Sequence, residues 1–320
     1  MTISRRQLVP AITTALVLAT TGSFGQPAPK ASRLVFIHGR SQQGRNADEI
    51  KSEWMGALAE GAEKAGLRVP AGVDVQLPFY GDKLDGFARA WDVPLAQDIG
   101  SRGNPEDREF LEFQADIAEQ LRQGAGIGDE QVEQELGPGP RERGPLNWNW
   151  VQAILRALDR YAPGTSSSTI ETFTRDVFLY TRRAGVRDEI DRIVAASITE
   201  EPTVIVGHSL GSVVAYNILR TDRRRLQVPM FATVGSPLGI RTIRDQFAPV
   251  RYPQPPVQSW YNAFDRRDTV ALFPLDGTNF PVRPAVVNNG DIRNQTENRH
   301  GIVGYLNDAD VARHVLASLA

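Results

Sequence analysis

Apolar residues form short continuous runs along the chain, and helical stripes separate these runs. Residues 34–37 and 203–206 are apolar or β-branched throughout, and residues 73–80 alternate between apolar and polar. Continuous runs of this length are typical of strands buried on both faces, and alternation also predicts a strand. Further strands are predicted within residues 229–237, 256–265 and 283–289.

Helical periodicity occupies much of the sequence between these strands. Asn46 and Glu49 form a predicted capping pair before one apolar stripe, and Ser168 and Glu171 form an S-x-x-E capping box before another. An amphipathic helix is predicted over residues 308–320. Strands that alternate with helices predict an α/β fold, with a mostly parallel sheet and helices on both faces.

The regular alternation is lost over residues 81–164. A helix is predicted near residues 108–121, a polar segment rich in glycine and proline over 124–145, and a helix over 146–161. We interpret residues 81–164 as a cap-like insertion over the core. A linker to a separate domain is the alternative.

The first 31 residues have the layout of an export signal. The paired Arg5 and Arg6 precede a weakly apolar run over residues 8–21 and then small residues. The run is too short to span a bilayer, and the paired arginines resemble a twin-arginine signal. The pattern predicts a protein exported to the periplasm or beyond, cleaved near residues 23–25. A cytoplasmic protein with an uncleaved tail is the alternative.

Residues 32–320 are predicted to form one domain with this insertion, and the composition of the whole chain excludes several classes of function. The chain has 320 residues, of which 41% are hydrophobic and 23% charged, and a formal net charge of −2. This composition is typical of a globular protein, and the small net charge provides no overall electrostatic attraction to nucleic acid or to a membrane surface. There is no cysteine, which excludes disulfides, a thiol nucleophile and cysteine-type zinc sites. None of the four histidines lies in an HExxH motif.

A Gly-His-Ser-Leu-Gly sequence lies between a predicted strand and a predicted helix. A sharp strand-to-helix turn would strain the backbone of Ser209 and expose its hydroxyl above the sheet. Gly207 and Gly211 stand where a Cβ atom would crowd such a turn. The N–H of Leu210, at the start of the helix, is then a predicted oxyanion donor.

A second oxyanion donor is expected from the loop after the first strand. His38 and Gly39 end that strand, and the N–H of Arg40 is the favoured donor, with Ser41 as the alternative. His38 is interpreted as a brace for this loop rather than a catalytic group. His208, within the Gly-His-Ser-Leu-Gly sequence, is interpreted as structural.

A serine nucleophile needs a base, and the base needs a group that orients it. The order expected in this architecture is serine, acid, histidine. His300 follows the last predicted strand and is the favoured base, because His314 lies inside the final helix. Asp268 is the favoured acid, and Asp265, three residues earlier, is the alternative.

Five segments together resemble the α/β-hydrolase superfamily, and within it the lipase and esterase members that carry GHSLG. They are FIHGR, VGHSLGS, TVGSPL, NAFDRRDTVA and RHGIVGY. The resemblance implies a mostly parallel sheet of eight strands, a Ser-Asp-His triad, no cofactor or metal, and an inserted helical cap. Residues 81–164 depart from the resemblance, because they match no cap that we recognise, and this leaves the substrate open.

The expected function is hydrolysis of carboxylic esters through an acyl-enzyme. The partner would be a small-molecule or lipid-like acyl ester, and Trp148 and Trp150 would either line its acyl chain or only pack. The same residues could serve a thioesterase, an amidase or an acyltransferase. The alternative from another class is a binding module that keeps the fold without catalysis.

Overall fold

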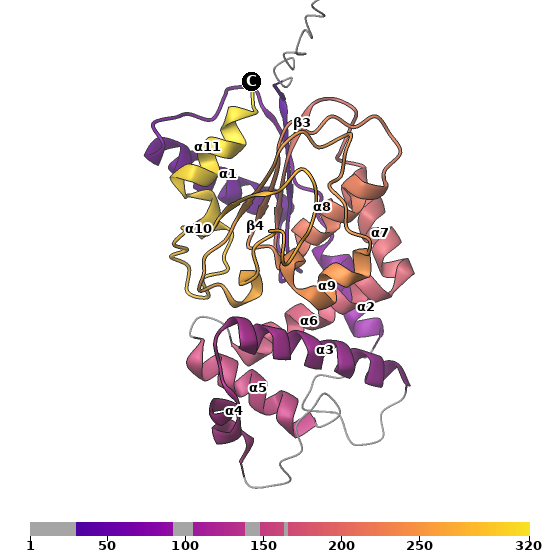
Figure 1. Ribbon diagram of the computed structural model, residues 1–320. Helices are drawn as coiled ribbons and strands as arrows, with labels where there is room; N and C mark the ends of the chain where they lie inside the picture. The colour runs from indigo at the N-terminus through magenta and orange to yellow at the C-terminus, as the bar shows by residue number, and fades with distance from the viewer. Residues whose placement is uncertain (1–29, 92–104, 138–147, 163–165) are drawn as a thin grey trace, which may run out of the picture.

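One parallel sheet forms the centre of the molecule (Figure 1). The computed structural model describes residues 30–91, 105–137, 148–162 and 166–320. The six strands, in chain order, are β1 (Arg33–Ile37), β2 (Asp74–Gln76), β3 (Thr203–His208), β4 (Phe231–Val234), β5 (Trp260–Ala263) and β6 (Val287–Asn289). Their order in the sheet is β2-β1-β3-β4-β5-β6, and every neighbouring pair is parallel.

The α/β class is therefore confirmed, but the sheet has six strands where the resemblance implied eight. Between β2 and β3 the described residues form helices and turns and no strand. The described parts of the long crossover from β2 to β3 are consequently helical. The predicted export signal lies outside the described residues, apart from its last two positions.

The helices cover both faces of the sheet and one of its ends. They are α1 (Ala47–Lys64), α2 (Gly81–Ala90), α3 (Pro105–Gly124), α4 (Asp129–Leu136), α5 (Trp148–Tyr161), α6 (Ser167–Arg182), α7 (Ala184–Ala195), α8 (Leu210–Thr221), α9 (Arg241–Arg244), α10 (Val303–Leu306) and α11 (Ala309–Ala317). Short 3₁₀ turns follow β4, α9 and β5.

Two buried cores lie on opposite faces of the sheet. Val35 and Ile37 of β1 point into the core shared with α6, α7 and α8, and Leu34 and Phe36 point into the core shared with α1 and α11. Successive side chains of a strand point to opposite faces, so an unbroken apolar strand supplies both cores. This is why the apolar runs lack the alternation of a half-exposed strand.

Helices α3, α4 and α5, which lie within residues 81–164, form a helical layer beyond the carboxyl ends of the strands (Figure 1). Helix α2 packs on α6 and α7. Helix α5 packs on both α3 and α4, and this group contacts the rest of the fold through α6 and α9. Gln120 Nε2 of α3 donates to Thr242 Oγ1 of α9 at 2.6 Å. Helix α4 lies in the segment that the sequence showed as polar, and only Val132 of that helix is buried.

The predicted helix caps met different outcomes. Asn46 caps α1, because its side chain accepts from the N–H groups of Asp48 and Glu49. The predicted box of Ser168 and Glu171 is wrong. Helix α6 begins at Ser167, and Ser166 is its cap, accepting from the N–H of Thr169 at 3.2 Å. A serine-rich stretch offers several caps, and the side chain one turn before the apolar face is the one used.

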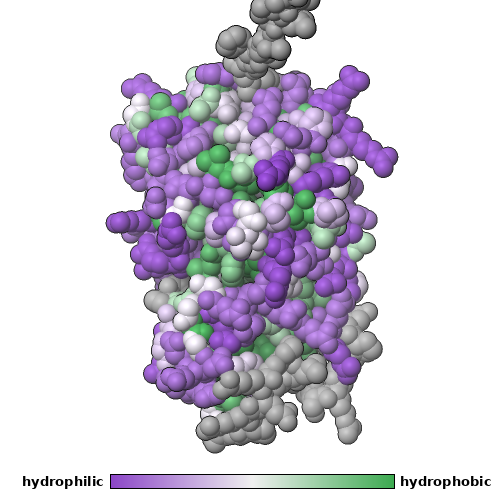
Figure 2. Space-filling model, in the orientation of Figure 1, coloured by the Kyte–Doolittle hydropathy of each residue, from purple (hydrophilic) through white to green (hydrophobic). Residues whose placement is uncertain are grey.

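Hydrophilic residues predominate on the face shown in Figure 2, with smaller hydrophobic areas in its middle. Among the described residues, no helix has the length and apolar character needed to cross a membrane.

Candidate active site

The site lies where the carboxyl ends of the parallel strands meet. The loop with Gly39 follows β1, Ser209 follows β3, Gly235 follows β4, Asp268 follows β5 and His300 follows β6. Ends of parallel strands share one edge of a sheet, so residues far apart in sequence converge there. The helical layer of α3, α4 and α5 lies at this same end (Figure 1).

Ser209 occupies a strained turn between β3 and α8. Its backbone has φ of 53° and ψ of −129°, in the left-handed half of conformational space that residues with a Cβ rarely adopt. A Cβ atom on Gly211 would overlap the carbonyl oxygen of Ile37, and one on Gly207 would stand 2.7 Å from Ser212 Cα. The turn thus needs glycine at both positions, as predicted.

Ser209, His300 and Asp268 form a continuous chain of hydrogen bonds. His300 Nε2 lies 2.8 Å from Ser209 Oγ, and His300 Nδ1 lies 2.7 Å from Asp268 Oδ2. An ionised carboxylate only accepts, so Nδ1–H donates to Asp268 and Nε2 accepts from the serine hydroxyl. Ser209 and Asp268 are fully buried, and His300 is 9% exposed. The imidazole is thus oriented to take the serine proton.

Asp265 is not part of this chain. Its carboxylate accepts from the Arg267 side chain and from the N–H of Asn294 at 2.8 Å. Burial alone would raise the pKa of Asp265, but these hydrogen bonds together lower it. His314 also lies elsewhere, stacked on Tyr261 with ring centroids 3.9 Å apart.

The loop after β1 lies directly against Ser209. A Cβ atom on Gly39 would stand 2.8 Å from Ser209 Cβ and 3.4 Å from Ser209 Oγ, so only glycine permits this approach. Leu210 is the first residue of α8, where an N–H has no acceptor within the helix. Ser41 has φ of 60°, a second residue with a side chain in the left-handed region. The loop after β1 and the first residue of α8 thus both lie next to Ser209.

The side chain of Arg40 ties this loop to α6. Its Nη1 donates to the carbonyl oxygen of Thr169 at 3.2 Å, and its Nε lies 3.6 Å from Asp176 Oδ2. Arg175 also contacts Asp176. Burial raises the pKa of Asp176, and the two guanidinium groups oppose that shift. The loop beside Ser209 is therefore held by a buried ion pair with α6.

His38 braces the same loop. Its Nδ1 lies 2.7 Å from the carbonyl oxygen of Gly39, and its Nε2 accepts from the N–H of Tyr80 at 3.1 Å. The Tyr80 hydroxyl donates to the carbonyl oxygen of His38, and the two rings stack. Burial lowers the pKa of His38 to about 4. The ring is thus neutral with its proton on Nδ1, and both of its nitrogens hold backbone groups.

His208 has a comparable place on the other side of the turn. Its Nε2 lies 2.7 Å from the carbonyl oxygen of His300, and the two rings are 4.9 Å apart. Burial, and secondarily the nearby His300, lower the pKa of His208 well below its usual value. A neutral His208 can donate one hydrogen bond to the His300 backbone, which positions the segment that carries the His300 ring.

Some residues of the site were not anticipated from the sequence. Tyr305 Oη donates to Asp268 Oδ2 at 2.6 Å. Gly235 has φ of 57°, and a Cβ atom there would stand 3.3 Å from both Asp268 Oδ2 and His300 Cε1. Both lie within segments quoted above, TVGSPL and RHGIVGY, but the sequence pattern does not single out these two residues within the segments.

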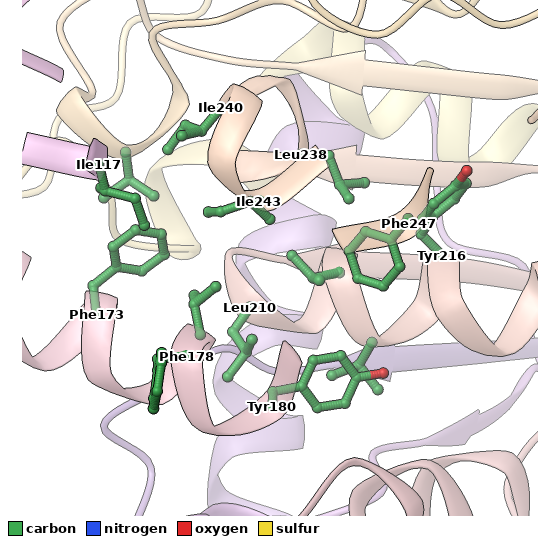
Figure 3. Packing of buried hydrophobic residues seen from close by; sticks show 14 of the residues in the cluster. Ile117, Phe173, Phe178, Tyr180, Leu210, Tyr216, Leu238, Ile240, Ile243 and Phe247 are labelled. Carbon is green, nitrogen blue, oxygen red and sulfur yellow. The ribbon is translucent and has the colours of Figure 1, made fainter. Parts of the chain in front are cut away.

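A small polar cavity of about 20 Å³ adjoins the loop after β1. Arg40 and Ser41 line it from the loop, and Thr172, Arg175 and Asp176 line it from α6. This volume holds about one water molecule. Leu210, by contrast, points into an apolar cluster with Phe173 of α6 and Ile117 of α3 (Figure 3). The surroundings of Ser209 are therefore polar toward the loop and apolar toward the helical layer.

No protein-family model matches the chain, and searches of curated proteins and of solved structures found no match. Within the parts of the chain that the structure describes, no group of three or more His, Cys, Asp or Glu side chains is arranged to hold a metal ion.

Proposed function

We propose that the protein is a serine hydrolase of carboxylic esters. One observation carries the proposal, the chain of hydrogen bonds from Ser209 Oγ through His300 to Asp268. Together with the strained turn at Ser209 and the donors beside it, this chain supplies a nucleophile, a base and an orienting carboxylate.

In the proposed reaction Ser209 Oγ attacks the carbonyl carbon of the ester, while His300 Nε2 takes the hydroxyl proton. Asp268 holds the imidazole in the required tautomer and stabilises the imidazolium. The imidazolium then protonates the leaving alkoxide, which departs as the alcohol and leaves an acyl-enzyme on Ser209. Water, deprotonated by His300, attacks the acyl-enzyme and releases the acid and free Ser209.

The N–H groups of Leu210 and Arg40 are the proposed donors to the oxyanion, with Ser41 as the alternative to Arg40. The close approach of Gly39 to Ser209 supports this assignment, since it brings the loop backbone to the reacting oxygen. The layer of α3, α4 and α5 is proposed as the cap, and its apolar contact with Leu210 favours an acyl group of apolar character.

Thioester, amide and acyl-transfer reactions use the same residues and are distinguished by assay with those substrates. A module that only binds its ligand has less support. The strained turn costs about 1–3 kcal/mol, which a binding fold has no reason to keep.

The test is labelling with a fluorophosphonate probe and assay on p-nitrophenyl esters of increasing chain length. Wild-type protein should be labelled at Ser209. Ser209→Ala should lose labelling, and ester turnover should fall by roughly 10⁴-fold or more. Ester turnover by His300→Gln should fall by a similar factor.

Two matched variants serve as controls. Ser52→Ala alters an exposed serine of α1, and His314→Gln alters the histidine of α11. Both should retain wild-type turnover. Folded wild-type protein that neither reacts with the probe nor hydrolyses any ester, thioester or amide would refute the proposal.

A further inference from the structure

The hydroxyl of Tyr305 meets the same carboxylate oxygen that orients His300. Asp268 Oδ2 accepts from Tyr305 Oη at 2.6 Å and from His300 Nδ1 at 2.7 Å. The other oxygen, Oδ1, accepts from the N–H of Val270 at 3.0 Å. Each oxygen of this fully buried carboxylate thus has at least one donor inside the protein.

The surroundings of Tyr305 fix its hydroxyl as a hydrogen-bond donor to Asp268. Its side chain is fully buried at the start of the C-terminal helical segment, in α10. The N–H of Asp265 donates to its hydroxyl oxygen at 3.2 Å, which directs the hydroxyl proton toward Asp268. Burial and the adjacent Asp268 raise the pKa of Tyr305 well above its usual value, so the phenol keeps its proton and acts as a donor.

We infer that Tyr305 is a positioning residue for Asp268, acting on the proposed reaction through the carboxylate and the imidazole without touching the substrate. The inference rests on the proposed function. A neutral donor on Oδ2 fixes the rotation of the carboxylate and shares the negative charge that faces His300.

The consequence for pH dependence has a definite sign. Without the tyrosine hydroxyl, Oδ2 becomes a stronger acceptor for Nδ1–H, so the imidazole retains its second proton to higher pH. The acidic limb of the rate profile should then move to higher pH. Among the described residues, the titratable groups that face this unit besides Asp268 are the neutral His208, 4.9 Å from His300, and Asp265, held by Arg267.

Two substitutions of Tyr305 should shift the acidic limb of the rate profile in opposite directions. Tyr305→Phe removes the hydroxyl and should lower kcat about tenfold with little change in KM, because the imidazole is less well oriented. It should also move the acidic limb up by roughly half a pH unit. Site-specific 3-fluorotyrosine keeps the ring and strengthens the donor, so its acidic limb should move to lower pH.

Tyr180→Phe is the matched control. Tyr180 of α6 is also fully buried, and its hydroxyl donates to Asp191 Oδ1 of α7 at 2.6 Å rather than to Asp268. This variant loses an equivalent tyrosine–carboxylate bond and should leave the acidic limb unmoved. Unmoved limbs in both position-305 variants would overturn the inference, as would an equal loss of kcat in Tyr305→Phe and Tyr180→Phe.

A second measurement separates this inference from the proposed function. The proton on His300 Nδ1 should give a low-field NMR resonance, which Tyr305→Phe should shift and Tyr180→Phe should not, whether or not any ester is hydrolysed. Inactive wild-type protein would refute the esterase proposal alone. A resonance unchanged by Tyr305→Phe would overturn the role of Tyr305 alone.

Discussion

The residues around Ser209 show how a strained turn is held in place. The left-handed backbone of Ser209 costs about 1–3 kcal/mol, so the neighbouring structure must offset it. It does so by close backbone packing, since Gly211 lies against the carbonyl group of Ile37 and Gly39 lies against Ser209. Strand β1 and helix α8 can approach this closely only because two glycines lie between them.

A pair of glycine substitutions tests this packing. Gly211→Ala would place its Cβ on the Ile37 carbonyl and should lower the free energy of unfolding by about 3 kcal/mol. Gly56→Ala, at an exposed position of α1 with no atom within 4 Å of the new Cβ, should raise it by about 0.5–1 kcal/mol. Chemical denaturation of both variants measures the difference. Equal effects of the two substitutions would contradict the packing argument.

At the scale of elements, the loop after β1 and helix α6 behave as one unit. The Arg40 guanidinium reaches from the loop to Asp176 and to the carbonyl oxygen of Thr169, both on α6. The backbone of Arg40 is a proposed oxyanion donor, so this ion pair links the proposed cap side of the molecule to the site. This link forms only when α6 packs beside the loop that follows β1.

A double-mutant cycle measures this link. Asp176→Asn alone leaves the Arg40 charge buried without its partner and should cost about 3 kcal/mol of stability. Arg40→Met with Asp176→Asn should cost less than the sum of the single changes, with a coupling of about 1–3 kcal/mol. Glu189→Gln breaks the exposed ion pair with Arg192 on α7 and should change the free energy of unfolding by too little to measure. Additive effects at Arg40 and Asp176 would show that the pair is not coupled.

At the scale of the whole molecule, both faces of the sheet and its carboxyl end are covered. One consequence is that His38 and His208 are buried between the sheet, α1 and the loops of the site, and both are neutral. Folding therefore prefers the unprotonated form of each ring. The whole fold is thus coupled to pH through residues next to Ser209.

Stability should fall in mild acid for this reason. The pKa of His38 drops from 6.5 in the unfolded chain to about 4 in the fold, so between these values the unfolded state binds more protons. Stability is then fully present above pH 6.5 and is lost as the pH falls toward 4, by about 3 kcal/mol from His38 alone. The free energy of unfolding, measured by denaturant from pH 7.5 to 4, checks this.

The control is His38→Gln, which should have a shallower dependence on pH over the same interval because one titrating ring is gone. The difference in the free energy of unfolding between this variant and the wild type at pH 7.5 measures the cost of losing the hydrogen bonds with Gly39 and Tyr80. A variant whose stability falls as steeply as that of the wild type would assign the pH dependence to other groups.

Local pattern was sufficient for several features of this protein. The strand positions followed from apolar runs, and the cap of α1 followed from Asn46. The strained turn at Ser209 and its glycines followed from the motif and the elements on either side. These features depend on residues close together in the sequence, where periodicity and steric rules operate.

Tertiary structure decided the rest. Asp268 and Asp265 both follow β5, and only the packing of the loop turns Asp268 toward His300 and Asp265 toward Arg267. The contact of Tyr305 with Asp268 spans 37 residues, and the sheet of the described residues has six strands rather than the eight that the resemblance implied. Distance along the chain explains the division, because contacts between distant segments depend on how all the elements pack together and leave no periodic signal in the sequence.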